Sequence, residues 1–414
     1  MSLNQKTSPT TSERLTALFA HRTTRMKASE IRELLKLLDQ PDIISFAGGI
    51  PDPAYFPREA FAEAMVKATG EQAASVALQY STSEGYTPLR DWIAGYMSRY
   101  GISCSRDNIL ITAGSQQALD YIGKIFIDPD DTALVTWPTY MGALGAFNAY
   151  EPRYDRIDPQ TNRPVEAVLA DAEEAGGQVK FAYLSPDFAN PTGITLSEEQ
   201  RRTVLARAEA LDCAVIEDAA YQELRYRGEV IKPILALELE DKGDIDACRT
   251  IYLGSFSKTL SPGLRVGWVV AAKPVISQMV LIKQAGDLQT ATINQIAISE
   301  VAHSVFDSHV ATLREVYGGR LTAMLTALER HMPEGVSWTN PDGGMFVWVT
   351  LPTDMDGAEL LQEALKANVA FVPGAAFFAD GSNRNTLRLN FSMSAAAKIE
   401  EGIARLGSVI RSQL

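Results

Sequence analysis

The middle of the chain alternates short apolar runs with amphipathic stretches, and this alternation limits the fold more than any other feature. The apolar runs begin at about residue 105 and are NILITAG, TALVTWP, KFAYLSP, CAVIED and RTIYLGSFS. Between them, the stretches SQQALDYIGKIF, YMGALGAFNAY and SEEQRRTVLARAEAL have the apolar spacing typical of helices. Strands separated by helices of this kind form parallel sheets. We therefore predict an α/β fold, with a mainly parallel sheet and helices on both faces.

The last third of the chain has a different pattern, in which one long helical region precedes further strands and helices. Helical periodicity runs over residues 307–332, and the pair Gly318 and Gly319 predicts a break in it. The segments that follow are GGMFVWVTLP, a helix over 357–367, AFVPGAAFF, TLRLNFS and a closing helix. This pattern predicts a second, smaller α+β domain.

The N-terminal segment is expected to connect the two domains. ASEIRELLKLL has helical periodicity, and the turn-rich DQPDIISFAGGIPDPAYFP after it is predicted to cross between the domains as a loop. We expect residues 1–50 to form an N-terminal arm and part of the small domain, 51–306 to form the large domain, and 307–414 to form the small C-terminal domain.

Charge and composition exclude several classes of function. The 414 residues carry a formal net charge of -13, whereas a nucleic-acid or anionic-membrane partner requires a basic surface. The three cysteines and four histidines are scattered, so neither a disulfide framework nor a metal site is predicted. No apolar run approaches the roughly 18 residues of a membrane helix, and the start lacks the apolar core of a signal peptide. We expect a cytoplasmic protein.

Polar residues stand at the ends of the predicted strands, where open parallel sheets bind ligands. Ser115 and Gln116 follow NILITAG and open a helix, whose N-terminus can hold a phosphate, although the motif taken alone favours a plain helix cap. Asn190 lies in the turn NPTG after KFAYLSP. Asp218 ends the run CAVIED, so we expect it either to be partly desolvated and paired with a positive group or to cap a helix. Tyr221 follows three residues later.

The last of these strand ends carries a lysine among small polar residues. RTIYLGSFS contributes Ser255 and Ser257, Lys258 follows at once, and Arg265 lies seven residues further on. Hydroxyls, a guanidinium and a helix N-terminus are donors suited to a phosphate dianion. Pyridoxal phosphate also requires an amine for its aldehyde and a carboxylate that keeps its ring nitrogen protonated. A lysine in such a turn, taken alone, is usually an ordinary solvated residue.

A series of stretches in collinear order resembles the fold-type I, class I/II aminotransferases, most closely the branch of the 2-aminoadipate (LysN-like) and kynurenine aminotransferases. These stretches are SFAGGIPDP, LQYSTSEGYTPLR, TAGSQQALD, WPTYMGA, NPTG, IEDAAY, YLGSFSKTLSPGLRVGW, GGMFVW, FVPGAAFF and TLRLNF. They cover nearly the whole chain. The resemblance implies a pyridoxal-phosphate-dependent aminotransferase whose large domain, residues 51–306, binds the cofactor.

The resemblance implies roles for single residues around the cofactor. Lys258 is similar to the lysine that forms the Schiff base and moves the substrate proton, and Asp218 is similar to the partner of the ring nitrogen. Asn190 and Tyr221 would hydrogen-bond the phenolate oxygen, and Tyr140 would stack on the ring. The positions that match the phosphate site are Ser115, Gln116, Ser255, Ser257 and Arg265, with Tyr80 reaching it from the neighbouring subunit of a homodimer.

Substrate contacts are implied in the same way. Arg388 in TLRLNF would bind the substrate α-carboxylate, for which a planar guanidinium is well suited. Asn190 would lie beside it, and Gly48 and Gly49 would let the loop backbone approach the substrate. Arg25 matches an arginine that can meet a distal substrate carboxylate, but the same residue also suits a solvated position before a helix.

One departure from the family is visible in DFANPTG. Asp187 and Ala189 stand where the branch commonly has a neutral polar residue and a glutamine. The core chemistry is unaffected, but the detailed placement of the substrate is left open by this difference.

The implied function is ping-pong transfer of an amino group from an L-amino acid to a 2-oxo acid, with 2-oxoglutarate the expected acceptor. 2-Aminoadipate, kynurenine, aromatic and aliphatic donors stay open, because loops decide which side chains fit. One alternative is a β-eliminating lyase on the same fold. Another is a cofactor-binding regulatory module, which would carry an added DNA-binding domain.

Overall fold

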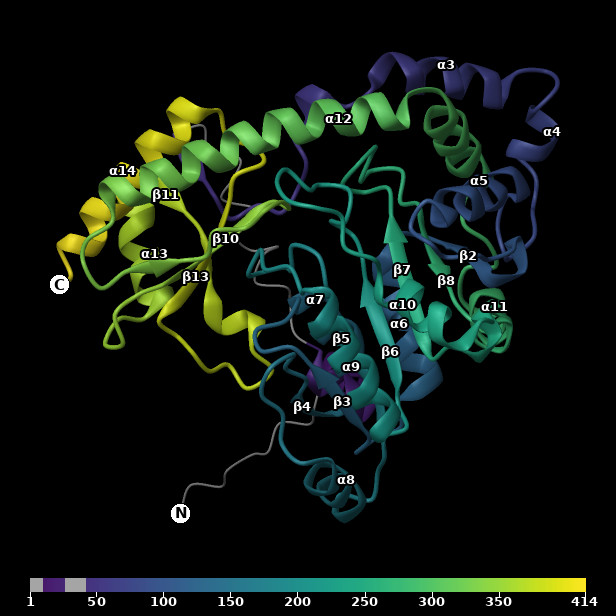
Figure 1. Cartoon of the computed structure of the whole chain (residues 1–414), viewed down its shortest axis with the longest axis horizontal. Coiled ribbons are helices and arrows are strands. Elements are labelled where there is room, and N and C mark those ends of the chain that lie inside the picture. Colours follow the sequence, from purple (N-terminus) through teal and green to yellow (C-terminus); the bar gives the residue numbers. More distant parts are fainter. Residues whose placement is uncertain (1–9, 27–41) are drawn as a thin grey trace.

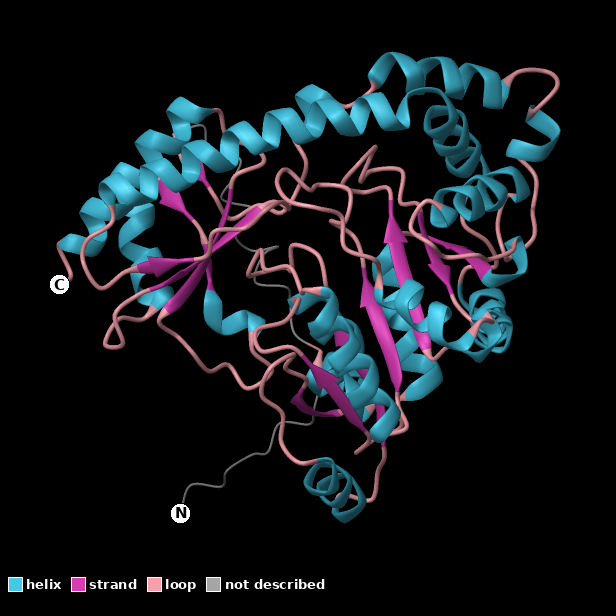
Figure 2. Cartoon of the chain, in the orientation of Figure 1, coloured by secondary structure: helices cyan, strands magenta, loops and turns pink. Residues whose placement is uncertain are grey.

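Two sheets of unequal size lie side by side, and one long helix runs along both (Figure 1, Figure 2). The computed structural model describes residues 10–26 and 42–414, so the predicted helix in ASEIRELLKLL lies outside the described residues. Within the described part of the chain, no helix is both long and apolar enough to cross a bilayer. The predicted α/β class is confirmed.

The large sheet has seven strands and is mainly parallel. The strands are β2 (Ile109–Thr112), β3 (Thr132–Val135), β4 (Arg153–Arg156), β5 (Val179–Leu184), β6 (Ala214–Asp218), β7 (Thr250–Ser255) and β8 (Gly267–Val270). Their order is β2-β8-β7-β6-β5-β3-β4, and β8 is antiparallel to both of its neighbours. Every predicted apolar run contains a strand, whereas β4 has the sequence RYDR at the sheet edge and gives no apolar signal.

Helices cover both faces of the large sheet, as the alternation predicts. On one face lie α6 (Ser115–Phe126), α7 (Met141–Asn148) and α11 (Lys273–Gly286). On the other lie α8 (Val165–Glu174), α9 (Glu198–Ala210) and α10 (Ile234–Lys242). Because neighbouring side chains on a strand point to opposite faces, Tyr183 on β5 packs with α6 and α7, whereas Ala182 packs with α8 and α9.

The smaller sheet has four antiparallel strands in the order β12-β13-β10-β9. These are β9 (Ser337–Trp338), β10 (Phe346–Thr350), β12 (Val372–Pro373) and β13 (Thr386–Asn390). Helices α13 (Gly357–Lys366) and α14 (Ala396–Arg411) pack here, and β1 (Ile44–Ser45) pairs in parallel with β11 (Val369–Ala370). The N-terminal segment therefore contributes to this lobe.

Helix α12 (Thr292–His331) connects the two lobes without interruption, so the break predicted at Gly318 and Gly319 is wrong. A glycine inside a helix costs about 1 kcal/mol relative to alanine, which tertiary packing readily outweighs. Gly318 lies against Tyr226, where an added Cβ would sit 3.4 Å from the tyrosine Cβ. The domain boundary that we expected between residues 306 and 307 falls inside this helix.

The remaining elements are short or lie around the large sheet. They are α1 (Thr11–Thr16), η1 (His21–Arg25), η3 (Pro53–Tyr55), α3 (Arg58–Thr69), α4 (Ala74–Ala77), α5 (Thr87–Ser98), η4 (Arg106–Asn108), η5 (Ile245–Ala247) and η6 (Gly374–Phe377).

Candidate active site

Lys258 lies just beyond the end of β7, in the space between the two lobes. Its Nζ donates a hydrogen bond to the Gly49 carbonyl at 2.8 Å and lies 5.8 Å from the centre of the Tyr221 ring. Burial lowers the lysine pKa to about 8, helped by the positive charges of Arg388 and Arg265 and opposed by Asp218. The side chain therefore gives up its proton at a lower pH than an exposed lysine does.

Asp218 ends β6 on the same face of the sheet as Tyr183. The Tyr183 hydroxyl donates to Asp218 Oδ2 at 2.8 Å, and the Ala220 N–H donates to Oδ1 at 3.4 Å. Burial raises the carboxyl pKa, although both donors and the charge of Lys258 oppose the shift. Asp218 is thus a desolvated carboxylate that would be stabilised by a further positive partner. Tyr183 was not assigned from the sequence, although its hydroxyl in an otherwise apolar run was the available signal.

Arg388 is fully buried at the centre of β13. Its Nη1 donates to Asn190 Oδ1 at 2.8 Å and its Nη2 donates to the Ala47 carbonyl at 2.9 Å, whereas Nε has no partner in the described part of the chain. The guanidinium lies 4.2 Å from the Phe346 ring centre and 5.1 Å from that of Phe377. Burial lowers its pKa to about 10. Neither aromatic was assigned from the sequence.

Asn190 connects the arginine to the lysine side of the site. Its Nδ2 donates to the Tyr221 hydroxyl at 3.5 Å while its oxygen accepts from Arg388. Tyr221 in turn packs edge-on against Phe346, with ring centres 5.6 Å apart. The structure therefore brings together Lys258, Asn190, Tyr221 and Arg388, as the sequence predicts.

The start of α6 and the turn before β8 bring together a helix N-terminus and a guanidinium, which are donors that could hold an anion. Ser115 is the first residue of α6, and Arg265 donates from Nη2 to the Ala113 carbonyl at 3.2 Å. The preceding Gly114 has φ of 80°, and a Cβ there would lie 2.4 Å from Arg265 Nη2. Glycine is thus required for the guanidinium to lie over the helix N-terminus. The adjacent turn adds Ser255, whose Oγ accepts from the Ser257 N–H at 3.1 Å.

Tyr140 and Gln116 lie next to each other beside these donors. The Tyr140 hydroxyl donates to Gln116 Oε1 at 3.4 Å, and Gln116 Nε2 donates to the Gly142 carbonyl at 2.7 Å. Burial and the nearby Asp218 raise the Tyr140 pKa, so its hydroxyl stays protonated. Tyr140 therefore offers a flat neutral ring near the carboxylate.

Two predicted residues lie apart from this cluster. Arg25 donates from Nη2 to the Pro152 carbonyl at 2.9 Å and lines a surface cavity of about 420 Å³ with Trp137 and Glu151. Tyr80 is 79% exposed in the segment after α4. Among the hydrogen bonds and ring contacts of residues 10–26 and 42–414, none joins either side chain to Lys258 or Arg388.

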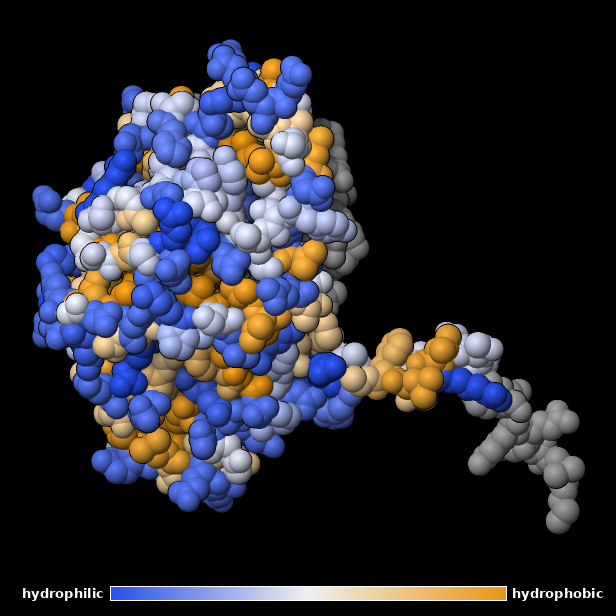
Figure 3. All heavy atoms as spheres, turned by 90° about the vertical axis from the view of Figure 1, so that its right-hand side faces the viewer, coloured by the Kyte–Doolittle hydropathy of each residue, from blue (hydrophilic) through white to orange (hydrophobic). Residues whose placement is uncertain are grey.

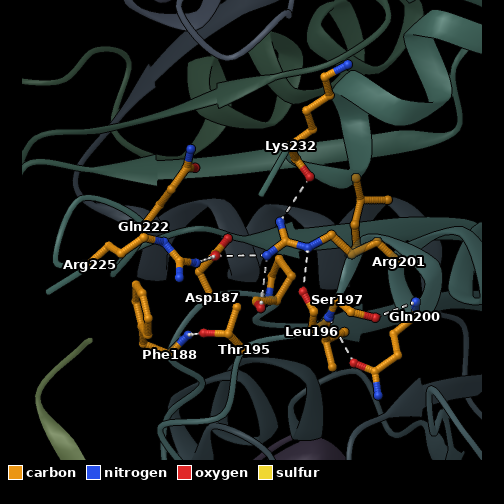
Figure 4. Close-up of polar contacts among 12 residues, drawn as sticks. Asp187, Phe188, Thr195, Leu196, Ser197, Gln200, Arg201, Gln222, Arg225 and Lys232 are labelled. Carbon is orange, nitrogen blue, oxygen red and sulfur yellow. Dashed lines mark hydrogen bonds and ion pairs between the residues drawn. The ribbon is translucent and has the colours of Figure 1, made fainter. Parts of the chain in front are cut away.

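Asp187, the departure noted in DFANPTG, also points away from the cluster. Its carboxylate is buried between Arg201 and Arg225 on the α9 side of the sheet (Figure 4). Ala189 contributes backbone contacts, accepting from the Gly193 N–H and donating to the Ile194 carbonyl. The Asp187 part of the departure therefore concerns the support of the loop that carries Asn190.

Comparison with known proteins agrees with this geometry. The family "aminotransferase class I and II" matches residues 42–406. Aromatic-amino-acid aminotransferase 1 of Thermococcus litoralis is 46% identical, over 96% of this chain and 94% of its own length. The 2-aminoadipate transaminase of Thermus thermophilus is 42% identical, over 94% and 96%.

A solved structure extends the agreement to the fold. The kynurenine aminotransferase of Pyrococcus horikoshii, solved in complex with PMP, superposes with a TM-score of 0.88 at 44% identity, covering 97% of this chain and 98% of that one. The match therefore extends over nearly the whole chain. On these grounds the chain belongs to the class I and II aminotransferases, the pyridoxal-phosphate-dependent enzymes of fold type I.

Proposed function

We propose that this site transfers the amino group of an L-amino acid to a 2-oxo acid, with 2-oxoglutarate as the acceptor, in two successive half-reactions. The observation that carries the proposal is the position of Lys258, an amine of pKa about 8 held between the Gly49 carbonyl and the Tyr221 ring. Such an amine can accept and return a proton near neutral pH. Asp218 and Arg388 lie close enough to influence its charge.

The side chains present fit pyridoxal phosphate. Asp218 would hold the proton on the ring nitrogen, Asn190 and Tyr221 would hydrogen-bond the phenolate oxygen, and Tyr140 would cover the ring. The donors for the phosphate would be Ser115, Gln116, Ser255, Ser257 and Arg265. When bound, the cofactor supplies an aldehyde that combines with amines and a ring that withdraws electrons from the substrate α carbon.

Lys258 would move the proton at the substrate α carbon. Its lowered pKa, about 8, makes the neutral amine far more populated near neutral pH than in an exposed lysine, and that form can accept the proton. The hydrogen bond to the Gly49 carbonyl restrains the position of Nζ. Asp218 contributes by retaining a negative charge in a desolvated position, where a positive ring nitrogen would offset its burial.

Arg388 would bind the substrate α-carboxylate. Its guanidinium is buried between two aromatic rings, and in the described part of the chain it forms no ion pair with an acidic side chain. A carboxylate ligand would supply the missing charge with bidentate geometry. Gly49 borders this position, because a Cβ there would lie 3.3 Å from Phe346 Cζ and 3.7 Å from Arg388 Nη2. A side chain at 49 would therefore crowd the carboxylate.

The active unit is proposed to be a homodimer with shared sites. Tyr80 is 79% exposed and would reach the phosphate of the neighbouring subunit, in a surface that also exposes Val76 and Leu78. The N-terminal segment extends from the body of the molecule, and its residues Leu15 and Leu18 are exposed (Figure 3). Exposed apolar side chains of this kind are typical of surfaces that become covered. Mixing inactive Tyr80→Ala and Lys258→Ala subunits should restore part of the activity if sites are shared, and no recovery would contradict sharing.

The candidate amino donors are aminoadipate, kynurenine, and aromatic and aliphatic amino acids. We propose that Arg25 contacts the distal carboxylate of dicarboxylic substrates after releasing the Pro152 carbonyl. The three cysteines are free, which fits a cytoplasmic location.

The decisive experiment follows the visible spectrum of the holoenzyme when L-glutamate is added. Transamination predicts loss of the yellow colour with release of one equivalent of 2-oxoglutarate, and recovery of the colour when an oxo acid is supplied. A yellow colour that persists with glutamate and with a panel of other amino acids would contradict the proposal. Release of ammonia and pyruvate from a β-substituted amino acid, without any oxo-acid requirement, would instead favour the β-eliminating lyase.

A further inference from the structure

A buried group of three charges supports the loop that carries Asn190. This loop, residues 186–196, is called the Asn190 loop. Asp187, which is 2% exposed, accepts at Oδ1 from Arg201 Nη2 at 2.8 Å and from Arg225 Nη2 at 3.0 Å (Figure 4). Both arginine side chains are almost fully buried. Removing one partner from such a group leaves uncompensated charge in a low-dielectric environment. We name Asp187, Arg201 and Arg225 the Asp187 clamp.

Arg201 fastens both ends of the Asn190 loop. Besides Asp187, its guanidinium donates to the Pro186 carbonyl at 3.3 Å and to the Leu196 carbonyl at 3.1 Å. The Leu196 N–H closes the base of the loop by donating to the Pro186 carbonyl at 2.8 Å. The clamp therefore fixes where the loop leaves and rejoins the large lobe.

Arg225 fastens the middle of the loop through Phe188. Its guanidinium lies 4.7 Å from the Phe188 ring centre, and Phe188 has a φ of 51°, a region that bulky residues rarely adopt. On the other side, the phenylalanine fills the space where Cβ atoms on Gly343 and Gly344 would be, each 2.5 Å from it. A strained conformation of this kind persists only when its surroundings hold it.

The same segment joins the clamp to the small lobe. The backbone of Arg225 forms a bridge with Gly343, and the Gly344 N–H donates to the Leu224 carbonyl at 2.8 Å. Two residues further along, Phe346 begins β10 and stacks on Arg388. Two of the groups that contact the Arg388 guanidinium, Asn190 and Phe346, thus lie on segments joined to the clamp.

We propose that Asp187 is a positioning residue for Arg388, and that through Asn190 and Phe346 it sets the affinity of the site for carboxylate ligands. The inference rests on the proposed role of Arg388 in binding the substrate α-carboxylate. Arg388 depends on this support because, within the described residues, its only hydrogen bonds go to Asn190 and to the Ala47 carbonyl. Asp187 touches neither substrate nor cofactor, and its effect is transmitted by the loop.

The test uses Asp187→Asn, which keeps the shape of the side chain and removes its charge. Calorimetric titration of the holoenzyme with glutarate and with 3-phenylpropionate measures carboxylate affinity without catalysis, because neither molecule has an amine or an oxo group. We expect about a tenfold weaker affinity for whichever probe the native protein binds. In steady-state assays KM should rise for both the amino donor and the oxo acid, with a smaller change in kcat.

Asp131→Asn is the matched control. Asp131 is also buried and paired, with Lys180 Nζ 3.3 Å away, but it lies at the start of β3, far along the chain from the Asn190 loop. This variant should be destabilised while binding both probes like the native protein. An equal loss of probe affinity in both variants would show general destabilisation and overturn the inference.

Arg388→Gln separates this inference from the proposed function. If Arg388→Gln binds the carboxylate probes as tightly as the native protein does, the proposed role of Arg388 is wrong and the inference falls with it. If Arg388→Gln weakens binding but Asp187→Asn does not, only the positioning role is wrong. In the double variant, Asp187→Asn should cause no further loss.

A milder variant covers the case in which Asp187→Asn does not fold. Arg225→Lys keeps the positive charge but loses the planar group over Phe188, so it loosens the middle of the loop and leaves the Arg201 contacts in place. Its probe affinity should fall about threefold. Native affinity in this variant, together with native KM values, would contradict the role of the clamp.

Discussion

Buried charges lie on both faces of the large sheet, and the two groups differ in how fully they are paired. On the α9 side, Asp187 has two arginine partners, and Glu217 accepts from the Ile234 and Leu235 N–H groups at 2.7 and 2.9 Å. On the α6 side, Asp218 and Lys258 have neither an ion pair nor a helix N-terminus among the described residues, because their hydrogen bonds join a tyrosine hydroxyl, one backbone N–H and one backbone carbonyl.

The difference in pairing distinguishes charges that stabilise the fold from charges that are available for chemistry. Two adjacent residues of β6 illustrate the difference. Glu217 faces α10 and accepts hydrogen bonds from its N-terminal N–H groups, whereas Asp218 faces the opposite side of the sheet and accepts a hydrogen bond from the Tyr183 hydroxyl. Isolated charge is expensive to bury, so charges that serve the fold are paired within the chain. The charges on the α6 side are those whose partners a cofactor and a substrate would supply.

The largest expected effect comes from Lys258→Ala. The variant loses the amine that moves the substrate proton, so turnover should fall at least about a thousandfold. Among the described residues, no acidic side chain forms an ion pair with Lys258. Its removal therefore leaves no unpaired charge, and the Tm of the apoprotein should stay close to the native value. Stopped-flow assays with the best amino donor and thermal denaturation measure the two effects. Lys180→Ala, which removes the ion-pair partner of Asp131, is the control that should retain turnover, and normal turnover in Lys258→Ala would exclude the proposed role.

Asp218→Asn should have the next largest effect. An amide cannot hold the proton on the ring nitrogen, so we expect about a hundredfold loss of turnover with the bound cofactor retained. Stability should move the other way. The folded pKa of Asp218 is raised, so ionisation opposes folding at neutral pH, and the apoprotein variant should have a higher Tm.

The contrast with Asp131→Asn makes this prediction specific. Asp131 is paired with Lys180, so its variant should lose stability and keep turnover. If both aspartate variants lower the Tm equally, the two groups of charges do not differ as we argue. An unchanged rate in Asp218→Asn would show that another group partners the ring nitrogen.

The sequence predicted the positions of the charged residues on the α6 side better than it predicted the side chains around the site. Asp218 and Lys258 stand where apolar runs stop, so their position at one edge of a parallel sheet follows from the pattern alone. Phe346 and Phe377 could not be assigned to Arg388 in this way, because the contacts form between separate segments of the small lobe. The partners of Asp187 are likewise 14 and 38 residues away, on α9 and in the segment after β6.

Glu217→Gln tests the paired side through pH. Burial raises the pKa of Glu217 from 4.5 to about 7, although Arg201 and the two backbone donors oppose the shift. Below pH 4.5 the carboxyl is neutral in both folded and unfolded chains. Between pH 4.5 and 7 only the unfolded chain ionises, so native stability should fall as pH rises, by about 3 kcal/mol in all. The glutamine variant lacks this contribution.

The measurement is the difference in apoprotein stability between native and Glu217→Gln from pH 5 to 8. The difference should change in favour of the variant as pH rises and level off above the folded pKa, at about 7. If the stability difference between the native protein and Glu217→Gln does not change with pH, the α10 N-terminus stabilises the Glu217 carboxylate fully. Glu217 would then be as completely paired as Asp187.

The smallest expected effect is that of Arg25→Gln, outside both groups. Arg25 is only partly buried, and it must release the Pro152 carbonyl before it can meet a distal carboxylate. A solvated charge pair formed at that expense contributes well under 1 kcal/mol, so kcat/KM for 2-aminoadipate and glutamate should fall about threefold. For phenylalanine and leucine it should not change, because they carry no second carboxylate. Equal losses for all four donors would mean that Arg25 serves the N-terminal segment and leaves selectivity to the loops around Gly49 and Tyr140.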